Sequence, residues 1–347
     1  MWTSGPYVMS EDTVSQRVFL HNPYYPIATP GNIEQVNLHF IEDGGTAYAL
    51  AKDGQLDQTP VTTSELPVVV ELPPNMVALQ IPSNAVFYFG FNLTKPPFDN
   101  VHVRRAFNAM FDRQAFIEQI VGGRGLPMLH FTPPQVSLAP AREEIGVLLD
   151  YSYARREMEL AGYRDCAGFP QIDIITFRGA GTWGEFLASL AEDVLGCDPA
   201  LFNNEQLEFS LLLEIIGPDT PADERPHLWT LGWGGDYPDP HSWLYEVLYC
   251  RADNPFGRPC SVVDDLLLQA AHASDTSQAR PYVEIESRLF GPDGEFPILP
   301  IFQRASYELF QAWFVGPHQQ DGFIGGRHWD AYRIDMAAKL AARSNTD

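Results

Sequence analysis

Short β-branched and aromatic segments alternate with amphipathic helical segments along most of this chain, and this alternation limits the folds that it can adopt. AVFYFGFN at 85–92, QIDIITF at 171–177 and HLWTLGWGG at 227–235 are typical of buried strands. Periodic apolar residues predict helices over about 100–121, 151–162 and 183–196. Strands that alternate with helices indicate an α/β fold with mixed sheets.

The remaining segments give a less regular pattern. Residues 5 to about 60 are predicted to form short strands with turns, plus one short helix that ends at Gly54. VVVEL at 68–72 and QLEFSLLLEII at 206–216 are further strand candidates. FPILPIFQRASYELF at 296–310 is predicted to be a strand pair or a bent strand, after two helices near 262–274 and 278–290.

Length and charge narrow the class of protein. With 347 residues the chain is long enough for two lobes. Its formal net charge of −23 would repel phosphate backbones, which argues against nucleic acid as a partner. The sequence contains no apolar run of the roughly 18 residues that a transmembrane helix needs. Met1-Trp2-Thr3-Ser4 lacks the features of a signal peptide, so the chain is either cytosolic or has lost its beginning.

Four cysteines leave several interpretations open. Cys250 and Cys260 flank a loop, RADNPFGRP, that a disulfide would close easily. Cys166 and Cys197 lie in turn-like surroundings and form the second expected pair. Both disulfides would imply an oxidising compartment. Four inert thiols are the alternative, whereas the cysteine spacing does not favour zinc.

The most unusual local sequence is GWGGDYPDP at residues 232–240. The glycines, Gly234 and Gly235 among them, would let the backbone approach a ligand closely or adopt positive φ. The carboxylate of Asp236 could accept charge-assisted hydrogen bonds from an ammonium group, with Trp233 and Tyr237 as flat apolar walls. The alternative is a turn in which Asp236 or Asp239 caps a helix that begins near Trp243, and Asp239 favours this capping role.

Other polar residues have simpler interpretations. Arg178 and Trp183 lie in a Gly-rich loop between a strand and a helix, where they are either ligand contacts or parts of an exposed loop and a helix start. Arg105 and Asp112 are expected to form a structural ion pair on one helix face, together with Arg104. Asn92 is expected to fix the following KPPF turn with its side chain.

Enzyme motifs are missing from the sequence. It contains no G-x-S-x-G, H-E-x-x-H, GxGxxG or Walker pattern, and its histidines are scattered. Asp236 and Asp239 could be imagined as a hydrolytic carboxylate pair, but the intervening Tyr-Pro argues against a shared geometry. No cofactor and no metal site are expected.

Five segments in order resemble the solute-binding proteins of peptide and nickel ABC transporters. They are GPYVMSE with QRVFLHNPYY, AYALAKDGQLD, the block FYFGFNLTKPPFDNVHVRRAFNAMFDRQAFIEQIVGGRGLP, YSYARREMELAGY and LGWGGDYPDPHSWL. The resemblance runs from about residue 5 to 335. It starts in the middle of the family's sequence pattern, because members of the family carry roughly 200 residues before the "GPY" point. It therefore covers about the C-terminal two-thirds of a family member.

The resemblance implies a type II periplasmic-binding-protein-like fold, with two lobes of mixed sheets and an incomplete first lobe. Residues 1–85 would be part of lobe one, 86–300 lobe two, and 301–347 the return to lobe one with a C-terminal tail. In peptide-binding members the aspartate at the place of Asp236 holds the ligand's ammonium group, and Trp233 matches a tryptophan near the pocket.

The expected function is capture of a small ligand, most often a peptide, for import by the membrane subunits of an ABC transporter. The resemblance also implies an extracellular or periplasmic monomer, anchored as a lipoprotein in its full-length form. Two alternatives stay open: a ligand-sensing module of a regulator, which the full-length gene would reveal by a DNA-binding domain, and a hydrolase, which purified protein would reveal by turnover.

Overall fold

The computed structural model describes residues 4–61, 72–251, 253–272, 279–319, 321–323 and 327–344. The chain divides into two compact units, each treated separately below. Unit 1 contains residues 1–83 and 305–347, and unit 2 contains residues 84–304. The sequence-based boundaries at 85 and 300 lie within a few residues of these limits.

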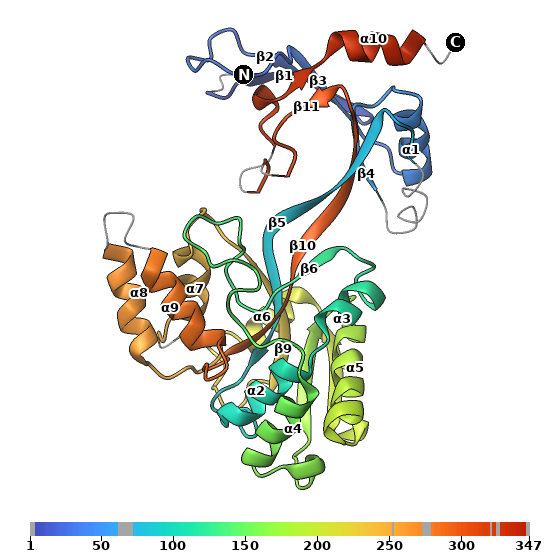
Figure 1. The fold of residues 1–347 in the computed structure, drawn as a ribbon. Helices are drawn as coiled ribbons and strands as arrows, with labels where there is room; N and C mark the ends of the chain where they lie inside the picture. The colour runs from blue at the N-terminus through green and yellow to red at the C-terminus, as the bar shows by residue number, and fades with distance from the viewer. Residues whose placement is uncertain are drawn as a thin grey trace. The chain divides into compact units, whose positions relative to one another are not determined.

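Figure 1 shows the helices and strands along the chain. The strands are β1 Tyr7–Asp12, β2 Gln16–His21, β3 Gln35–His39, β4 Gln58–Val61, β5 Met76–Phe91, β6 Gly125–Pro127, β7 Ile172–Phe177, β8 Phe202–Leu207, β9 Leu228–Gly234, β10 Ile298–Gln311, β11 Phe314–Val315 and β12 Arg333–Ile334. The α-helices are α1 Gly44–Lys52, α2 Val101–Met110, α3 Arg113–Gln119, α4 Tyr151–Leu160, α5 Gly181–Leu190, α6 Phe209–Ile215, α7 His241–Leu248, α8 Val262–His272, α9 Ala279–Phe290 and α10 Met336–Ser344.

The main sheet has mixed strand directions, as the sequence predicts. Its order is β4-β10-β5-β9-β7-β8, with β6 paired to β10. β7 runs parallel to both β8 and β9, whereas β5 and β9 are antiparallel, with Val86 opposite Trp233. β7 and β9 therefore end at the same edge of the sheet, at Phe177 and Gly234. The long strands β5 and β10 are the segments that pass from one unit to the other.

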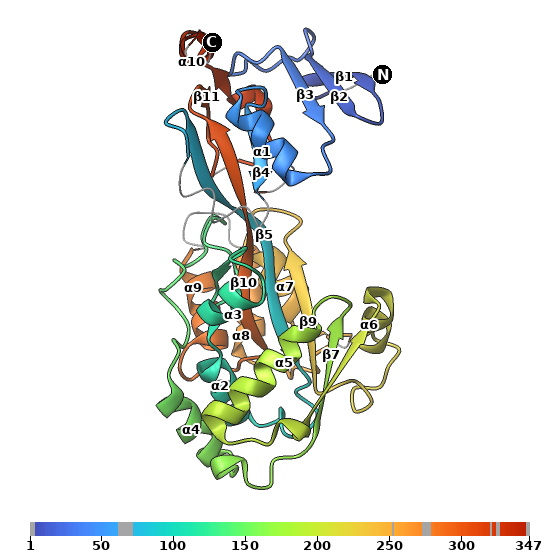
Figure 2. The same cartoon turned by 90° about the vertical axis from the view of Figure 1, so that its right-hand side faces the viewer.

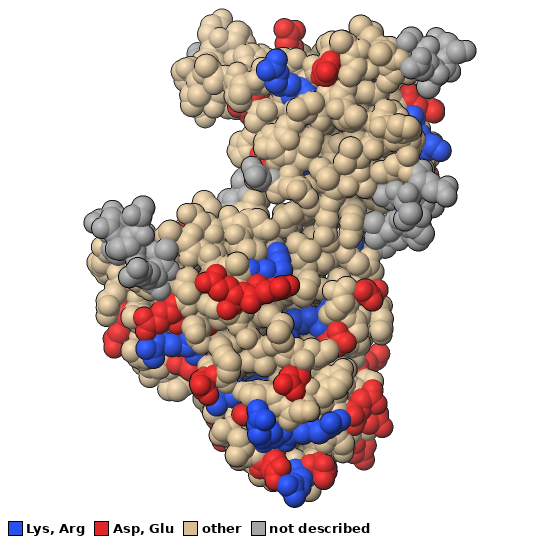
Figure 3. Space-filling view, viewed as in Figure 1, with Lys and Arg blue, Asp and Glu red and all other residues tan. Residues whose placement is uncertain are grey.

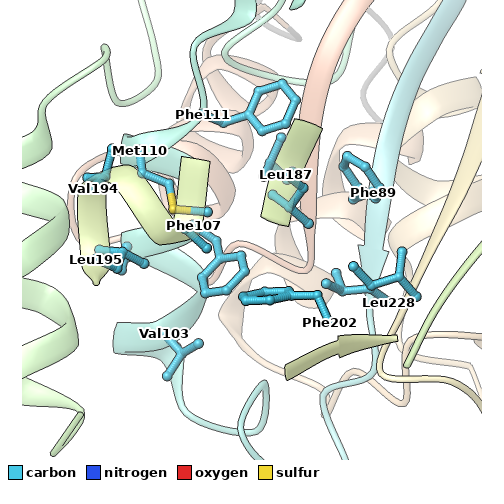
Figure 4. Packing of buried hydrophobic residues seen from close by; sticks show 14 of the residues in the cluster. Phe89, Val103, Phe107, Met110, Phe111, Leu187, Val194, Leu195, Phe202 and Leu228 are labelled. Carbon is cyan, nitrogen blue, oxygen red and sulfur yellow. The ribbon is translucent and has the colours of Figure 1, made fainter. Parts of the chain in front are cut away.

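A dense aromatic core holds unit 2 together. Phe107 of α2 stacks on Phe169, and Phe111 lies against Phe116 and Phe186. Figure 4 shows Phe107 of α2, and Phe111 just after α2, in one cluster with residues of α5, β5, β8 and β9. Full burial of such side chains contributes roughly 1.5–3 kcal/mol each, so this cluster can stabilise unit 2 without residues of unit 1.

Unit 1 has smaller apolar clusters. β1, β2 and β3 form a three-stranded antiparallel sheet (Figure 2). β11 pairs with β12. One cluster of buried residues centres on Trp313, Phe314 and Tyr332. A second cluster joins Ala51 of α1 to Leu309 of β10. Asp43 begins α1 by accepting the N–H of Thr46 at 2.7 Å, and Gly54 follows its end with φ of 68°.

The single helix predicted over 100–121 is wrong, because two helices occupy this segment. α2 ends at Met110 and α3 begins at Arg113. Between them Phe111 is extended, with ψ of 108°, and Oδ1 of Asp112 accepts the N–H of Ala115 at 2.9 Å. The apolar period continues across the break because both helices bury side chains in the same core.

Two other predictions of local structure are also corrected. The segment 206–216 is not one strand: β8 ends at Leu207, and α6 follows it. Of the two alternatives for 296–310, the strand pair is wrong, because β10 is one continuous strand from Ile298 to Gln311. The strand predicted at 85–92 is the end of the longer β5, and the strand predicted at 68–72 lies almost wholly outside the described residues.

Two disulfides lie within unit 2. Cys166 pairs with Cys197, and Cys250 pairs with Cys260. None of the helices in the part of the chain that the structure describes is long and apolar enough to cross a membrane.

Candidate ligand site

The corner between β9 and α7 places the residues of the GWGGDYPDP segment. Ser242, in the first turn of α7, ties this corner together from both sides. Its hydroxyl oxygen accepts the backbone N–H of Asp236 at 2.9 Å, and its carbonyl accepts Nε1 of Trp233 at 2.7 Å. Asp236 itself is exposed, and no hydrogen bond or ion pair to its carboxylate is found among the described residues. The fold thus fixes the backbone of Asp236 and leaves its charged group open to a ligand.

The glycines of this corner are required by close side-chain packing. A Cβ atom at Gly235 would lie 2.2 Å from the indole of Trp243, and one at Gly232 would lie 2.8 Å from the ring of Phe87. Neither Gly234 nor Gly235 has positive φ. Asn84 supports the same turn by donating from Nδ2 to the carbonyl of Gly235 at 2.8 Å. Approach of a ligand to this backbone stays a prediction.

Asp239 has the structural role that the sequence favours. Its Oδ1 accepts the N–H of His241, the first residue of α7, at 2.9 Å. The same oxygen accepts the hydroxyl of Tyr282 from α9 at 3.0 Å, which joins α9 to the start of α7. Helix α7 begins two residues earlier than predicted, at His241. Asp236 makes no comparable capping bond, so the two carboxylates differ in role.

The electrostatic environment beside Asp236 is negative. Partial burial, and then the carboxylates of Glu246, Asp239 and Asp236, raise the pKa of the Tyr237 hydroxyl above its ordinary value. The phenol therefore stays protonated at neutral pH and can donate to Nδ1 of His241, 2.7 Å away. A cation would be favoured at this corner and an anion disfavoured.

The second candidate loop follows β7, the strand beside β9. Arg178 is exposed, and its Nε lies 2.6 Å from Oε1 of Glu208. Trp183 is buried instead: its ring makes edge contacts with Phe87 at 5.8 Å and Phe116 at 5.3 Å. Trp183 therefore anchors the start of α5 in the core, and Arg178 is the side chain of this loop that a ligand could reach.

The helix charges form hydrogen bonds to the backbone, so the expected Arg105–Asp112 ion pair is wrong. Arg105 donates to the carbonyls of Gly294 and Asp293, whereas Asp112 caps α3. The guanidinium of Arg104 is likewise satisfied by backbone carbonyls, including that of Glu295 at 2.7 Å. Asn92 fixes its turn as expected, since Oδ1 accepts the N–H of Thr94 at 3.1 Å.

Several residues of the corner carry no clear signal in the sequence. Ser242 lies in the first turn of α7, Asn84 lies inside β5, and Tyr282 belongs to the distant helix α9. Their partners are set by the β9–α7 turn and by the packing of α9. Among the described residues no group of three His, Cys, Asp or Glu side chains could hold a metal ion.

Comparison with known proteins identifies the family. Residues 1–255 match the profile of the bacterial extracellular solute-binding proteins, family 5 (middle). The chain is 25% identical over 329 residues to the periplasmic oligopeptide-binding protein OppA of Salmonella typhimurium, and 22% identical over 315 residues to the oligopeptide-binding protein OppA of Bacillus subtilis. These matches cover 90% and 86% of this chain but only 57% and 55% of the relatives.

Solved structures show the same fold. The unliganded open form of MppA, a periplasmic murein tripeptide binding protein, matches with a TM-score of 0.76 and 20% identity, over 95% of this chain and 63% of that one. DppA of Helicobacter pylori in complex with the peptide STSA matches with a TM-score of 0.65 and 18% identity, over 95% and 63%. The fold is that of type II periplasmic binding proteins, and the chain belongs to the bacterial extracellular solute-binding proteins of family 5.

Proposed function

We propose that this protein captures short peptides and that Asp236 holds the ligand's amino-terminal ammonium group. The observation that carries the proposal is the exposed carboxylate of Asp236, which has a fixed backbone and, among the described residues, no partner. Ligands of α/β proteins characteristically bind beyond the carboxyl ends of parallel strands, where Asp236 lies. The carboxylates around Tyr237 also favour a positively charged ligand.

The rest of the corner supplies apolar contacts and a basic group. Trp233 is held by Ser242, and Tyr237 by His241, so both flat rings are oriented before a ligand arrives. Arg178 follows the neighbouring parallel strand β7 and would face the ligand's acidic end after leaving Glu208. Gly234 and Gly235 complete the wall without side chains of their own.

The role in the cell follows from the family. The ligand would be handed to the membrane subunits of an ABC transporter, by a monomer that acts in the periplasm or at the cell surface as a lipoprotein. The relatives named as oligopeptide-binding proteins support a peptide as the ligand. No feature of the described residues favours the regulator or the hydrolase.

Isothermal titration with di- to pentapeptides tests the role of Asp236. For the peptide that binds wild type most tightly, Asp236→Asn should weaken affinity by about 10- to 100-fold, because a charge-assisted hydrogen bond contributes about 1.5–3 kcal/mol. Asp219→Asn, at an exposed carboxylate in the loop before β9, is the matched control and should leave affinity unchanged. Equal affinity of wild type and Asp236→Asn would show that the ammonium group is held elsewhere.

A further inference from the structure

Helix α9 carries two polar side chains on its buried face. Tyr282 is 2% exposed, and Glu286 is fully buried. Their four-residue spacing places them one turn apart on the same side of the helix. The solvent side of α9 carries the exposed ion pair of Glu284 and Arg288, and Figure 3 shows acidic and basic side chains together over α8 and α9. Because a buried polar group is costly without a partner, the partners of Tyr282 and Glu286 indicate what α9 does.

Glu286 fixes α9 to the main sheet. Its two carboxylate oxygens accept the backbone N–H groups of Phe131 at 3.2 Å and Thr132 at 2.8 Å. The ring of Phe131 contacts the ring of Tyr88 edge-on, with 5.4 Å between the ring centres. Tyr88 belongs to β5 and lies opposite Leu231 of β9, the strand that leads to the candidate ligand corner. These contacts hold α9 in a fixed place relative to β9.

Tyr282 connects α9 to the ligand corner through Asp239. Its hydroxyl donates to Oδ1 of Asp239 at 3.0 Å, and the same oxygen accepts the N–H of His241 at the start of α7. The carbonyl of Asp239 accepts the N–H of Ser242 at 3.0 Å, and the hydroxyl oxygen of Ser242 accepts the N–H of Asp236. Three successive hydrogen bonds thus lead from α9 to the backbone of Asp236.

The bond between Tyr282 and Asp239 persists over a wide pH range. Burial first, and then the carboxylate of Asp239, raise the pKa of the Tyr282 hydroxyl well above its ordinary value. The phenol therefore stays protonated and keeps donating at neutral pH. Because its acceptor is a carboxylate, the bond is charge-assisted and stronger than one between neutral groups. The corner is thus ordered before a ligand arrives, which lowers the conformational entropy lost on binding.

We propose that Tyr282 is a positioning residue for ligand binding, which holds Asp236 where it meets the ligand's ammonium group without touching the ligand itself. This inference rests on the proposed function, because Asp236 transmits the effect of Tyr282 to the ligand. Glu286 supports the arrangement by fixing the helix that carries Tyr282. Loss of the Tyr282 hydroxyl would free the start of α7, so that the ligand must order the corner as it binds.

The variant Tyr282→Phe tests this role, because it removes the hydroxyl and keeps the buried ring. Affinity is measured by isothermal titration for the short peptide that wild type binds most tightly. We expect a loss of about 3- to 10-fold, since the loss cannot exceed the strength of the one hydrogen bond removed. Tyr153→Phe in α4 is the matched control: it removes a hydroxyl hydrogen bond to the carbonyl of Pro292, and affinity should not change.

A double-mutant cycle with Asp236→Asn separates positioning from a general weakening of the fold. In the Asp236→Asn protein, Tyr282→Phe should change affinity by less than about 2-fold, because the charge that it positions has been removed. Asp239→Ala cuts the same bond from the α7 side and should show the same dependence on Asp236. An equal loss in both backgrounds would overturn the proposal, and so would an unchanged affinity of Tyr282→Phe alone.

The proposed function and this inference fail in different ways. Equal affinity of wild type and Asp236→Asn would contradict the role of Asp236 and, with it, that of Tyr282. A clear loss of affinity in Asp236→Asn, together with additive effects in the cycle, would overturn the role of Tyr282 alone.

Discussion

At the scale of residues, the sequence shows which residue types gather at the candidate ligand corner, but it does not show their contacts. The order of glycines, aspartate and aromatic residues points to Asp236 and separates it from the capping residue Asp239. It does not point to Ser242, which fixes both Asp236 and Trp233, because that contact depends on how the turn folds back onto α7. Trp183 was a candidate ligand contact, but the structure buries it in the core. The sequence could not separate these roles, because an aromatic side chain suits a core and a ligand wall equally well.

His227 links stability to pH at the start of β9. Its Nδ1 accepts the backbone N–H of Asp173 at 3.0 Å, which requires the neutral ring. Burial, and then the charge of Lys95, lower the pKa of His227, against the opposing effect of the Asp173 carboxylate. The folded state therefore binds this proton less readily than the unfolded state. The contribution of neutral His227 to the free energy of unfolding is therefore complete above the ordinary histidine pKa of about 6.5. It is lost as the pH falls below that value.

We expect His227→Gln to flatten this dependence, because the glutamine oxygen can accept the same N–H without titrating. Urea unfolding from about pH 7 down to about pH 5 measures it. Wild type should lose more stability over this range than the variant. His318, whose pKa is lowered mainly by burial, contributes equally to both proteins and cancels in the comparison. Parallel stability curves for the two proteins would contradict the assignment.

At the scale of elements, the sequence predicts most helices and the buried strands. It does not predict the edge strand β8 or the break between α2 and α3. β7 and β9 are apolar because both lie inside the sheet and are largely buried. β8, with the sequence FNNEQL, is mostly polar because it is the last strand of the sheet. The apolar run after β8 therefore suggests a strand where α6 forms. The break before α3 has a local signal, the capping Asp112, that the continuous apolar period hides.

The β9–α7 corner gives a direct test of packing at this scale. Gly235→Ala should destabilise the protein by about 1–3 kcal/mol, because the new Cβ would press on the buried ring of Trp243. Thermal unfolding measures the effect. Gly45→Ala in α1 is the matched control: its Cβ would meet only Asp43, at 3.4 Å, and the helix should gain up to about 1 kcal/mol. A neutral Gly235→Ala would mean that the corner is looser than described.

At the scale of the whole molecule, the two units differ in the size of their buried apolar clusters. The aromatic core, both disulfides and the candidate ligand site all lie within residues 84–304. The pocket of unit 1 between β3 and Gln55–Pro60 could not be predicted, because it depends on which segments of the chain come together.

Unit 2 should therefore fold without unit 1. A protein of residues 84–304 is expected to unfold cooperatively and to show the near-ultraviolet circular dichroism of packed aromatic residues. Thermal unfolding and near-ultraviolet circular dichroism, measured on the protein with both disulfides formed, test this expectation. A broad transition with strong dye binding, as in a molten globule, would show that the core needs β4 or the start of β5.

The central claim is that this family member holds a peptide by its amino terminus, and native mass spectrometry of the purified 347-residue protein tests it most directly. The protein is offered an equimolar library of di- to pentapeptides and, separately, the same library acetylated at the amino terminus. The account predicts that free peptides are retained and that their acetylated forms are not, since acetylation removes the charge that Asp236 binds. Retention of both libraries, or of neither, would contradict it.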